Sequence, residues 1–423
     1  MSSQDPLKIG LVSSEYPPET DFGGLGSYTF KLAHALADDG HQVSVISAGN
    51  GSEVTFKTDG PVGVYRVPSP RRNLLGLGRS INNVVYSGRV CRLTKQLAAE
   101  GKVQIFQFPE YRGESFVHSL WGDAPYVVRF SMPRWLVDEI NRGTGRQMGP
   151  RSWLNGVIDR WCENTPVRRS RAFIFPSRDL MRVIEQRVGL KGLCRVVYPG
   201  VDAKRFTPGA DPELRRSFGL TGGPVALFVG RLEFRKGVHL IAEGAARIAA
   251  RVPNVRFAFV GSDTKSAPGG GGSMRAYMER VFQRDGLGAA VRFVGGIGHQ
   301  DVARLYGLGD VLMVPSIYEN LANVLLEGLA SGLPIVTTSG GGSPEVVEDG
   351  RNGRVVPSGD AIALADATAE MLADSNVRAV FSQNNRRKAL EDLSLERMAH
   401  ETVNVYREVL AGARSTKDVT ASR

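Results

Sequence analysis

The sequence of 423 residues contains few cysteines and no apolar run of membrane-spanning length. Its three cysteines, Cys91, Cys162 and Cys194, are isolated and odd in number, which argues against a disulfide framework or a thiolate zinc site. The start, MSSQDPLKIG, lacks the basic and apolar regions of a signal peptide. We therefore expect a cytoplasmic protein whose cysteines are small core residues.

Common nucleotide-binding and metal-binding motifs are also missing. No complete GxGxxG occurs, which disfavours a nicotinamide dehydrogenase, and the absence of GxxxxGK[ST] excludes a P-loop. There is no Asp-x-Asp pair to hold a divalent cation on a diphosphate. We therefore expect no cofactor and no metal, so that protein side chains must neutralise any diphosphate that binds.

The net charge of +10 is unevenly distributed. Residues 1–199 contain 26 Lys and Arg against 18 Asp and Glu, whereas residues 200–423 contain 27 against 25. The excess peaks in segment 61–95, which has no acid and seven cations: Arg66, Arg71, Arg72, Arg79, Arg89, Arg92 and Lys95. Such a segment suits peripheral contact with an anionic membrane at its inner face, although a merely solvated basic face is equally compatible. Nucleic acid is not expected, because interleaved aromatics and a recognition module are missing.

Apolar β-branched runs alternate with helical patterns along the whole chain, which is long enough for two domains. Strands are expected at 8–14, 42–48, 54–58, 62–67, 103–108, 126–130 and 172–176, and then at 225–229, 256–260, 291–294, 311–314, 335–338 and 354–356. This alternation predicts an α/β protein with two Rossmann-like, doubly wound sheets. The Gly/Pro-rich run 207–224 is predicted to connect the two domains.

The stretch from 311 to 348 combines a strand, a loop and a helix that carry two acids, Glu319 and Glu327. If Asn320 caps the helix, the remaining amides of the first turn form an anion site. Eight residues of helix would separate the carboxylates by up to roughly 12 Å, which leaves room for a diphosphate. Glu327 is then placed to bind a ribose and Glu319 a sugar, since a carboxylate accepts from vicinal hydroxyls. Two solvated surface acids are the alternative.

Ligands of open α/β sheets bind beyond the carboxyl ends of the strands. The run GRLEFRKG follows strand 225–229 and places Arg231 and Lys236 on one loop, where they can clamp a diphosphate. Gly23 and Gly24 precede the first helix, where backbone amides can approach a phosphate or sugar. These glycines are equally compatible with an ordinary turn.

Taken together, these motifs resemble the retaining glycosyltransferases of family 4, which have the GT-B fold. The resemblance covers nearly the whole chain and includes YPPETDFGGLGSYTF, YPGVDAKRF, GRLEFRKG, Gly261 in FVGSD, ENLANVLLEGLASGLPIV and GGSPE. It implies two domains that face a central cleft. Residues 1–200 would hold the acceptor and be completed by returning helices at 396–413, residues 201–395 would bind the donor, and 414–423 would be a disordered tail.

The family also implies a nucleoside diphosphate sugar as donor, with UDP as the commonest nucleotide. By motif, Glu327 would bind the ribose, Arg231 and Lys236 the diphosphate, and Glu319 the donor sugar. Backbone amides of Leu321, Ala322 and Asn323 would lie near the phosphates or sugar. Transfer would retain the anomeric configuration and need no metal.

The acceptor side departs from the family pattern, because Ser131 stands where the family often carries a histidine. A serine cannot supply the charge of an imidazolium. The acceptor-side candidates are Glu110, His118, Ser131, Met132 and Glu345. Of these, His118 lies one strand earlier and is a candidate substitute for the missing histidine, but a lone histidine is more often structural. Two alternatives therefore stay open: a non-catalytic partner that binds a nucleotide sugar, and a nucleotide-sugar epimerase or phosphorylase of the same fold.

Overall fold

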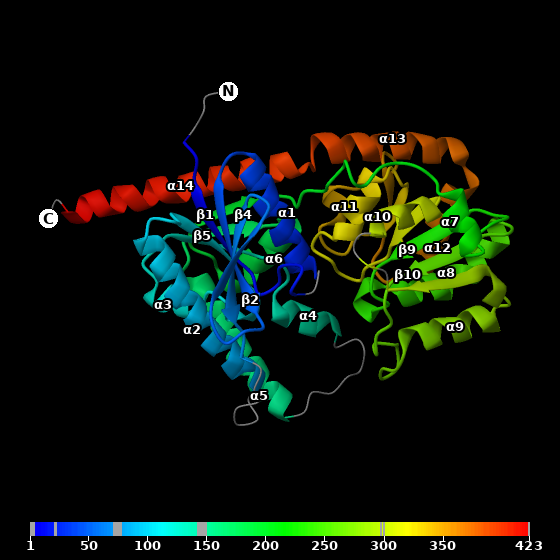
Figure 1. The fold of residues 1–423 in the computed structure, drawn as a ribbon. Helices are drawn as coiled ribbons and strands as arrows, with labels where there is room; N and C mark the ends of the chain where they lie inside the picture. Colours follow the sequence, from blue (N-terminus) through cyan, green and yellow to red (C-terminus); the bar gives the residue numbers. More distant parts are fainter. Residues whose placement is uncertain are drawn as a thin grey trace. The chain divides into compact units, whose positions relative to one another are not determined.

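A computed structural model describes residues 5–20, 23–70, 78–141, 150–296, 298 and 301–421. The chain divides into two compact units. The first unit comprises Met1–Leu136, Met148–Gly200 and Leu395–Arg423, and the second comprises Val137–Gln147 and Val201–Ser394. Both are α/β units (Figure 1).

The first unit contains an eight-stranded sheet with the order β3-β4-β2-β1-β5-β6-β7-β8. Its strands are β1 (Lys8–Val12), β2 (Gln42–Gly49), β3 (Thr55–Asp59), β4 (Val62–Pro68), β5 (Ile105–Pro109), β6 (Tyr126–Arg129), β7 (Ala172–Phe175) and β8 (Leu193–Val196). All pairings are parallel except that of β3 with β4. Our prediction missed β8, because this edge strand is only four residues long, is incompletely buried and includes the exposed Arg195.

Helices cover both faces of this sheet. They are α1 (Gly24–Asp38), α2 (Gly78–Ala99), α3 (Phe116–Trp121), α5 (Pro150–Arg169), α6 (Arg178–Val188) and α14 (Leu395–Ala421), while α4 (Arg134–Asn141) crosses the division between the units. On one face, α1 and α14 bury Leu32 and Tyr406 against the strands. On the other, Val90 and Leu97 of α2 pack against Phe106 and Phe108.

The second unit contains a six-stranded parallel sheet with the order β11-β10-β9-β12-β13-β14. Its strands are β9 (Val225–Val229), β10 (Arg256–Val260), β11 (Val291–Gly295), β12 (Val311–Val314), β13 (Ile335–Thr338) and β14 (Gly353–Val356). The central strands are buried along their whole length, as expected for apolar runs covered on both faces. The strand order reverses between β9 and β12, and such a reversal is where doubly wound sheets bind ligands.

The helices of the second unit are α7 (Pro212–Ser217), α8 (Val238–Arg251), α9 (Met274–Arg284), α10 (Val302–Leu305), α11 (Asn323–Ala330), α12 (Ala361–Ala373) and α13 (Ser375–Glu391). The predicted α/β class with two doubly wound sheets is confirmed.

Two predictions about chain segments are wrong. The units divide between Gly200 and Val201, and the presumed connection 207–224 instead contains α7. Its Asp211 accepts a hydrogen bond from the Leu214 amide, and Pro212 follows in the first turn, so these residues start a helix. The presumed disordered tail is also helical as far as Ala421, because residues 414–421 contain neither proline nor glycine to end α14.

Candidate functional site

The loops after β9 and β12 meet at the strand-order reversal of the second unit. The β9 loop ends at Gly237, whose φ is 65° and where a Cβ atom would lie 1.8 Å from the Pro315 carbonyl oxygen. Gly261, one of the residues that carry the family resemblance, has a similar structural constraint: a Cβ there would lie 1.9 Å from the Gly230 carbonyl oxygen. Glycine at both positions therefore allows the backbones around the site to approach closely.

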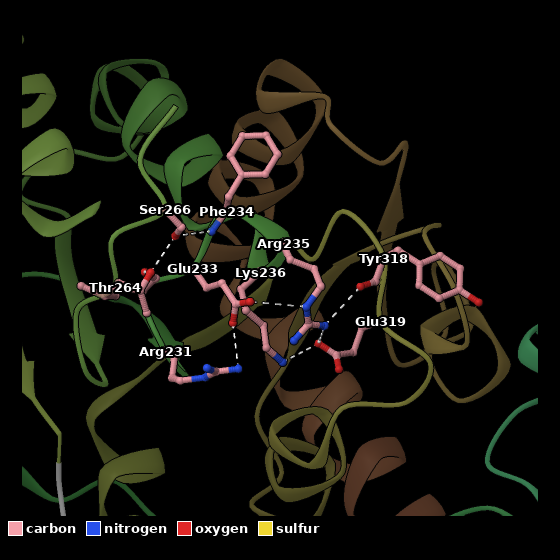
Figure 2. Close-up of polar contacts among 10 residues, drawn as sticks. Arg231, Glu233, Phe234, Arg235, Lys236, Thr264, Ser266, Tyr318 and Glu319 are labelled. Atoms are coloured by element: carbon pink, nitrogen blue, oxygen red, sulfur yellow. Dashed lines mark hydrogen bonds and ion pairs between the residues drawn. The ribbon is translucent and has the colours of Figure 1, made fainter. Parts of the chain in front are cut away.

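Two cations from the β9 loop converge on one acid from the β12 loop (Figure 2). Arg235 donates from Nη1 to Glu319 Oε2 at 2.9 Å, and Lys236 donates from Nζ to the same oxygen. The exposed fractions of the three side chains are only 9% for Arg235, 17% for Lys236 and 14% for Glu319. Lys236 and Glu319 were predicted to share one site, whereas Arg235 was not predicted to belong to it.

Burial alone would raise the pKa of Glu319, but Lys236 and Arg235 outweigh it and lower the pKa to about 2. The carboxylate is therefore ionised at any physiological pH. Its second oxygen, Oε1, accepts no hydrogen bond from the residues that the structure describes. This oxygen is a candidate acceptor for a ligand hydroxyl.

Arg231 lies on the same loop but does not pair with Glu319. Its Nη2 lies 3.0 Å from Glu233 Oε2, and its side chain is 63% exposed. Glu233 in turn lies 3.7 Å from Arg235 Nε, so the charges form one row, Arg231–Glu233–Arg235–Glu319–Lys236, with three cations and two acids (Figure 2). In the run RLEFRK no sequence pattern shows which arginine turns inward.

The start of α11 differs from the prediction. Asn320 is not its cap: the helix begins at Asn323, Ala322 is the N-cap residue, and no side chain caps it. The Asn320 Oδ1 atom instead accepts from the Leu321 amide in the preceding loop. Because residues 319–322 are not helical, the 12 Å spacing derived for a continuous helix does not apply. The uncapped first turn still offers amides to an anion.

Glu327 is buried in the middle of α11, with 9% of its surface exposed. Its Oε2 accepts a hydrogen bond of 2.7 Å from the Tyr306 hydroxyl. Burial raises the pKa of Tyr306 well above its ordinary value, so this hydroxyl stays protonated and donates. Tyr306 orients the carboxylate, but nothing in the sequence links a tyrosine before β12 to this acid.

In the first unit, Glu110 and Ser131 follow neighbouring strands β5 and β6. The Ser131 amide donates to Glu110 Oε2 at 2.8 Å, and its hydroxyl donates to Glu110 Oε1 at 3.0 Å. Burial raises the pKa of Glu110 to about 6, although the hydrogen bonds from Ser131 oppose the shift. Met132 follows, half-buried. Ser131, which stands where the family often carries a histidine, is thus hydrogen-bonded to a buried acid.

A second buried acid, Glu163 on α5, lies near Glu110 and accepts from the Arg112 amide at 3.1 Å. Burial, and then the charge of Glu110, raise the pKa of Glu163 to about 8. Both acids line one pocket, together with Phe130, Pro133, Trp135, Asn164, Val167, Ile184 and Val188. The sequence analysis missed Glu163, because a single acid in a helix carries no signal of its burial.

The remaining candidates have other surroundings. His118 is 1% exposed, and the rings of Phe106, Phe108 and Tyr126 surround it. Burial lowers its pKa to about 4, so it is a neutral core histidine and does not replace the missing one.

Glu345 was expected on the acceptor side, but it lies in the second unit, on the short helix η7 (Ser343–Glu345). In the first unit, Gly23 is the N-cap of α1, without a side-chain cap, and Gly24 opens the helix. A Cβ at Gly23 would lie 2.3 Å from Glu15 Oε2.

Comparison with known proteins identifies the family. The descriptions "Glycosyl transferases group 1" and "Glycosyltransferase Family 4" match residues 210–388 and 22–205. The D-inositol 3-phosphate glycosyltransferase of Corynebacterium urealyticum is 33% identical over 420 residues, which cover 95% of this chain and 96% of that protein.

Two solved structures show the same fold. Sucrose-phosphate synthase from Thermosynechococcus elongatus has a TM-score of 0.77 at 23% identity and covers 96% of this chain and 100% of its own. Anabaena Alr3699/HepE in complex with UDP and glucose has a TM-score of 0.67 at 18% identity, with coverage of 95% and 100%. These neighbours have the GT-B fold. The chain is therefore a GT-B glycosyltransferase and belongs to glycosyltransferase family 4.

Proposed function

We propose that this chain transfers a sugar from a nucleoside diphosphate sugar, most simply a UDP-sugar, to a hydroxyl group of an acceptor. The transfer retains the anomeric configuration and uses no metal ion. One observation carries the proposal: at the strand-order reversal of the second unit, Arg235 and Lys236 pair with an ionised Glu319, Arg231 extends this row of charge, and the nearby helix α11 begins without a side-chain cap. This arrangement suits a diphosphate with a hydroxyl-bearing group beside it.

Each group of the second unit has a distinct task in this proposal. Lys236, Arg235 and the first turn of α11 bind the diphosphate, and Arg231 adds charge at the exposed end of the row. The Oε1 atom of Glu319 accepts from the donor sugar. Glu327, oriented by Tyr306, accepts from the ribose hydroxyls. Gly261 lets the backbone approach the donor closely.

Catalysis then depends on positioning and on electrostatic stabilisation of the leaving diphosphate. The bond between the anomeric carbon and the phosphate oxygen breaks, and the acceptor oxygen bonds to the same face of that carbon. The acceptor proton passes to the departing phosphate. Cations already held by Glu319 need little reorganisation as negative charge develops on the leaving group.

The relatives support the donor class but differ in the acceptor. The Anabaena structure contains UDP and glucose, whereas the names of the other two refer to inositol 3-phosphate and sucrose phosphate. In this chain Glu110, Ser131 and Met132, which follow strands β5 and β6, are the candidate acceptor side, and Glu163 lies near Glu110. The buried acids favour an acceptor rich in hydroxyl groups.

Thermal shift with nucleoside diphosphates and nucleotide sugars tests the donor site, because a ligand that binds only the folded state raises the melting temperature. We expect a shift with UDP that is lost in Lys236→Met and kept in the matched control Lys57→Met, whose side chain is 71% exposed in the first unit. An unchanged UDP shift in Lys236→Met would contradict the proposed site.

Turnover separates the proposal from its alternatives. NMR of the product should show the anomeric configuration of the donor, at a rate unaffected by EDTA. If the sugar changes while still attached to the nucleotide and no acceptor is present, the chain is an epimerase. If it binds a nucleotide sugar but releases no nucleotide with any hydroxyl acceptor, it is a non-catalytic partner.

A further inference from the structure

Helices α2, α3 and α5 form one layer on the first unit's sheet (Figure 1). The Ser80 hydroxyl of α2 donates to Asn155 Oδ1 of α5 at 3.0 Å. The rings of Phe116 on α3 and Trp161 on α5 lie 4.7 Å apart. Tyr86, Val90, Leu93 and Leu97 of α2 pack into the apolar core against the sheet, so the outer side of the layer faces away from the sheet.

This outer side exposes large apolar side chains. The exposed fractions are 62% for Trp121, 61% for Trp161, 42% for Val85 and 37% for Val157. Val157 and Trp161 are four residues apart and therefore lie on the same stripe of α5. Tryptophan is rarely left this exposed without a partner surface, because burying it gains a large apolar area.

The exposed charged side chains that the structure describes within these three helices are cations. The exposed cations of the three helices are Arg89, Arg92, Lys95, Arg160, Arg168 and Arg169. Helices α2 and α3 contain no acid, and the two acids of α5, Asp159 and Glu163, are both 6% exposed. Two exposed acids flank the layer: Asp123, just after α3, lies 3.6 Å from Lys95 through Oδ2, and Glu100, just after α2, pairs with Lys102. The exposed cations of the three helices outnumber these two acids.

Apolar and basic side chains alternate along each stripe. On α2, Val85 is followed at four and seven residues by Arg89 and Arg92, which share its face. On α5, Trp161 is followed seven residues later by Arg168. Arg92 and Arg168 make no hydrogen bond or ion pair with any residue that the structure describes.

We infer that the outer surface of α2, α3 and α5 binds an anionic lipid membrane from one side. Exposed tryptophans and valines insert at the headgroup boundary, and the arginines and lysine pair with lipid phosphates. No helix among the described residues is long and apolar enough to span a bilayer, so the contact is peripheral. The inference concerns a different surface from the donor site and does not rest on the proposed function.

The surface differs from the segment 61–95 that the charge count indicated. Arg66 is 4% exposed and donates to the Tyr16 and Pro17 carbonyl oxygens, so it holds a loop and faces no membrane. Arg71 and Arg72 lie outside the described residues. The α2 part of the segment remains, and α3 and α5 add the tryptophans.

Co-sedimentation with vesicles tests the inference directly on the full chain. We expect binding to vesicles of phosphatidylglycerol and phosphatidylcholine in equal parts, weakening as NaCl rises from 0.1 to 0.5 M, and little binding to pure phosphatidylcholine. Equal sedimentation with both vesicle types, or with neither, overturns the inference.

Paired variants locate the surface. Arg92→Glu with Arg168→Glu should lower the vesicle partition coefficient at least 25-fold, since each lost cation accounts for about fivefold. The control, Arg216→Glu with Arg280→Glu, makes the same charge change on exposed positions of the second unit and should retain more of the binding. Equal losses in the two variants would show a general charge effect and overturn the assignment.

A second pair of variants tests the apolar contribution to vesicle binding. Trp161→Ser should weaken binding about tenfold, whereas Ile362→Ser, at a position 63% exposed in the second unit, should not. Melting temperature checks that both variants fold.

Tryptophan fluorescence gives a second readout. Brominated phosphatidylglycerol should quench the wild type and should quench Trp121→Phe with Trp161→Phe much less. Equal quenching overturns the inference. Two results together would also overturn the inference: duplex DNA or RNA sediments the chain through the same arginines, and Trp161→Ser binds vesicles as well as the wild type. The surface would then recognise phosphates without inserting into lipid.

Discussion

In the first unit the strand order reverses between β1 and β5, and in the second it reverses between β9 and β12. Both reversals bring acids to the carboxyl ends of the strands. In the second unit Glu319 accepts from a lysine and an arginine, which hold its pKa at about 2. In the first unit Glu114 accepts from the Ser14 amide at 3.0 Å, and burial raises its pKa to about 7.

In the proposed function, this difference suits the two units to two kinds of ligand. Cations keep Glu319 ionised, and the surplus positive charge suits a diphosphate. Burial raises the pKa values of Glu110, Glu114 and Glu163 to about 6, 7 and 8, and the hydrogen bonds that they accept from amides and hydroxyls offset only part of this rise. Partly protonated carboxyls both donate and accept hydrogen bonds, which suits a ligand rich in hydroxyls.

Removing a cation from the second unit should have the largest effect. Lys236→Met leaves Glu319 with Arg235 alone and removes charge from the diphosphate site, so we expect kcat to fall by about 10²–10³-fold. Release of UDP from the UDP-sugar that stabilises the chain measures this loss. Lys57→Met is the matched control. If Lys236→Met keeps a rate within threefold of wild type, the cations of the second unit do not form the diphosphate site, and the contrast between the two units fails.

The acids of the first unit should give the free energy of unfolding a pH dependence opposite to the one that Glu319 gives it. Glu163 has a folded pKa of about 8, above its ordinary 4.5, so the folded chain binds more protons between these values. Its stability contribution is complete below pH 4.5 and is lost as the pH rises through 8, by on the order of 3 kcal/mol between pH 5 and 8. For Glu319, stability is instead lost as the pH falls from 4.5 towards 2.

Glu163→Gln tests this sign, because the amide still accepts from Arg112 but does not ionise. We expect its melting temperature to vary less than that of wild type between pH 5.5 and 8.5. Glu408→Gln, an exposed acid paired with Arg195, is the control and should follow the wild type. Parallel pH curves for Glu163→Gln and wild type would show that Glu163 ionises normally.

Loss of an orienting hydroxyl should have a moderate effect. Tyr306→Phe removes the hydrogen bond to Glu327 without changing the ring, so we expect UDP affinity to fall about three- to tenfold. Isothermal titration measures the affinity, with Glu327→Gln as the reference for losing the carboxylate charge. If Tyr306→Phe binds UDP as well as wild type, Glu327 needs no orienting partner.

The smallest effect is expected at Arg231. Its side chain is exposed and pairs with Glu233, so Arg231→Gln should weaken UDP binding less than threefold. Arg235→Gln should weaken it more and also lower the melting temperature, because Glu319 loses a buried partner. If titration shows that Arg231→Gln weakens UDP binding more than Arg235→Gln does, Arg231 belongs to the diphosphate clamp that the sequence predicted.

Much of the fold could be read from the sequence, because a strand covered on both faces must be apolar throughout. The runs 225–229, 256–260, 311–314 and 335–338 match the observed strands at both ends. The site was predictable in part, since Lys236, Glu319 and Glu327 follow strands whose carboxyl ends meet. Asn320 was wrongly taken for a helix cap, because it bonds to its own neighbour's amide and the helix starts three residues later.

By itself, the sequence determined which loops follow the buried strands, since the positions of strands and loops along the chain follow from local patterns of apolar and polar residues. Only the tertiary structure decided which side chains turn inward. Arg235 and Arg231 are both arginines of one loop, yet one is buried against Glu319 and the other is solvated. Tyr306, Glu163 and the outer surface of α2, α3 and α5 likewise depend on contacts between distant segments, which no local pattern encodes.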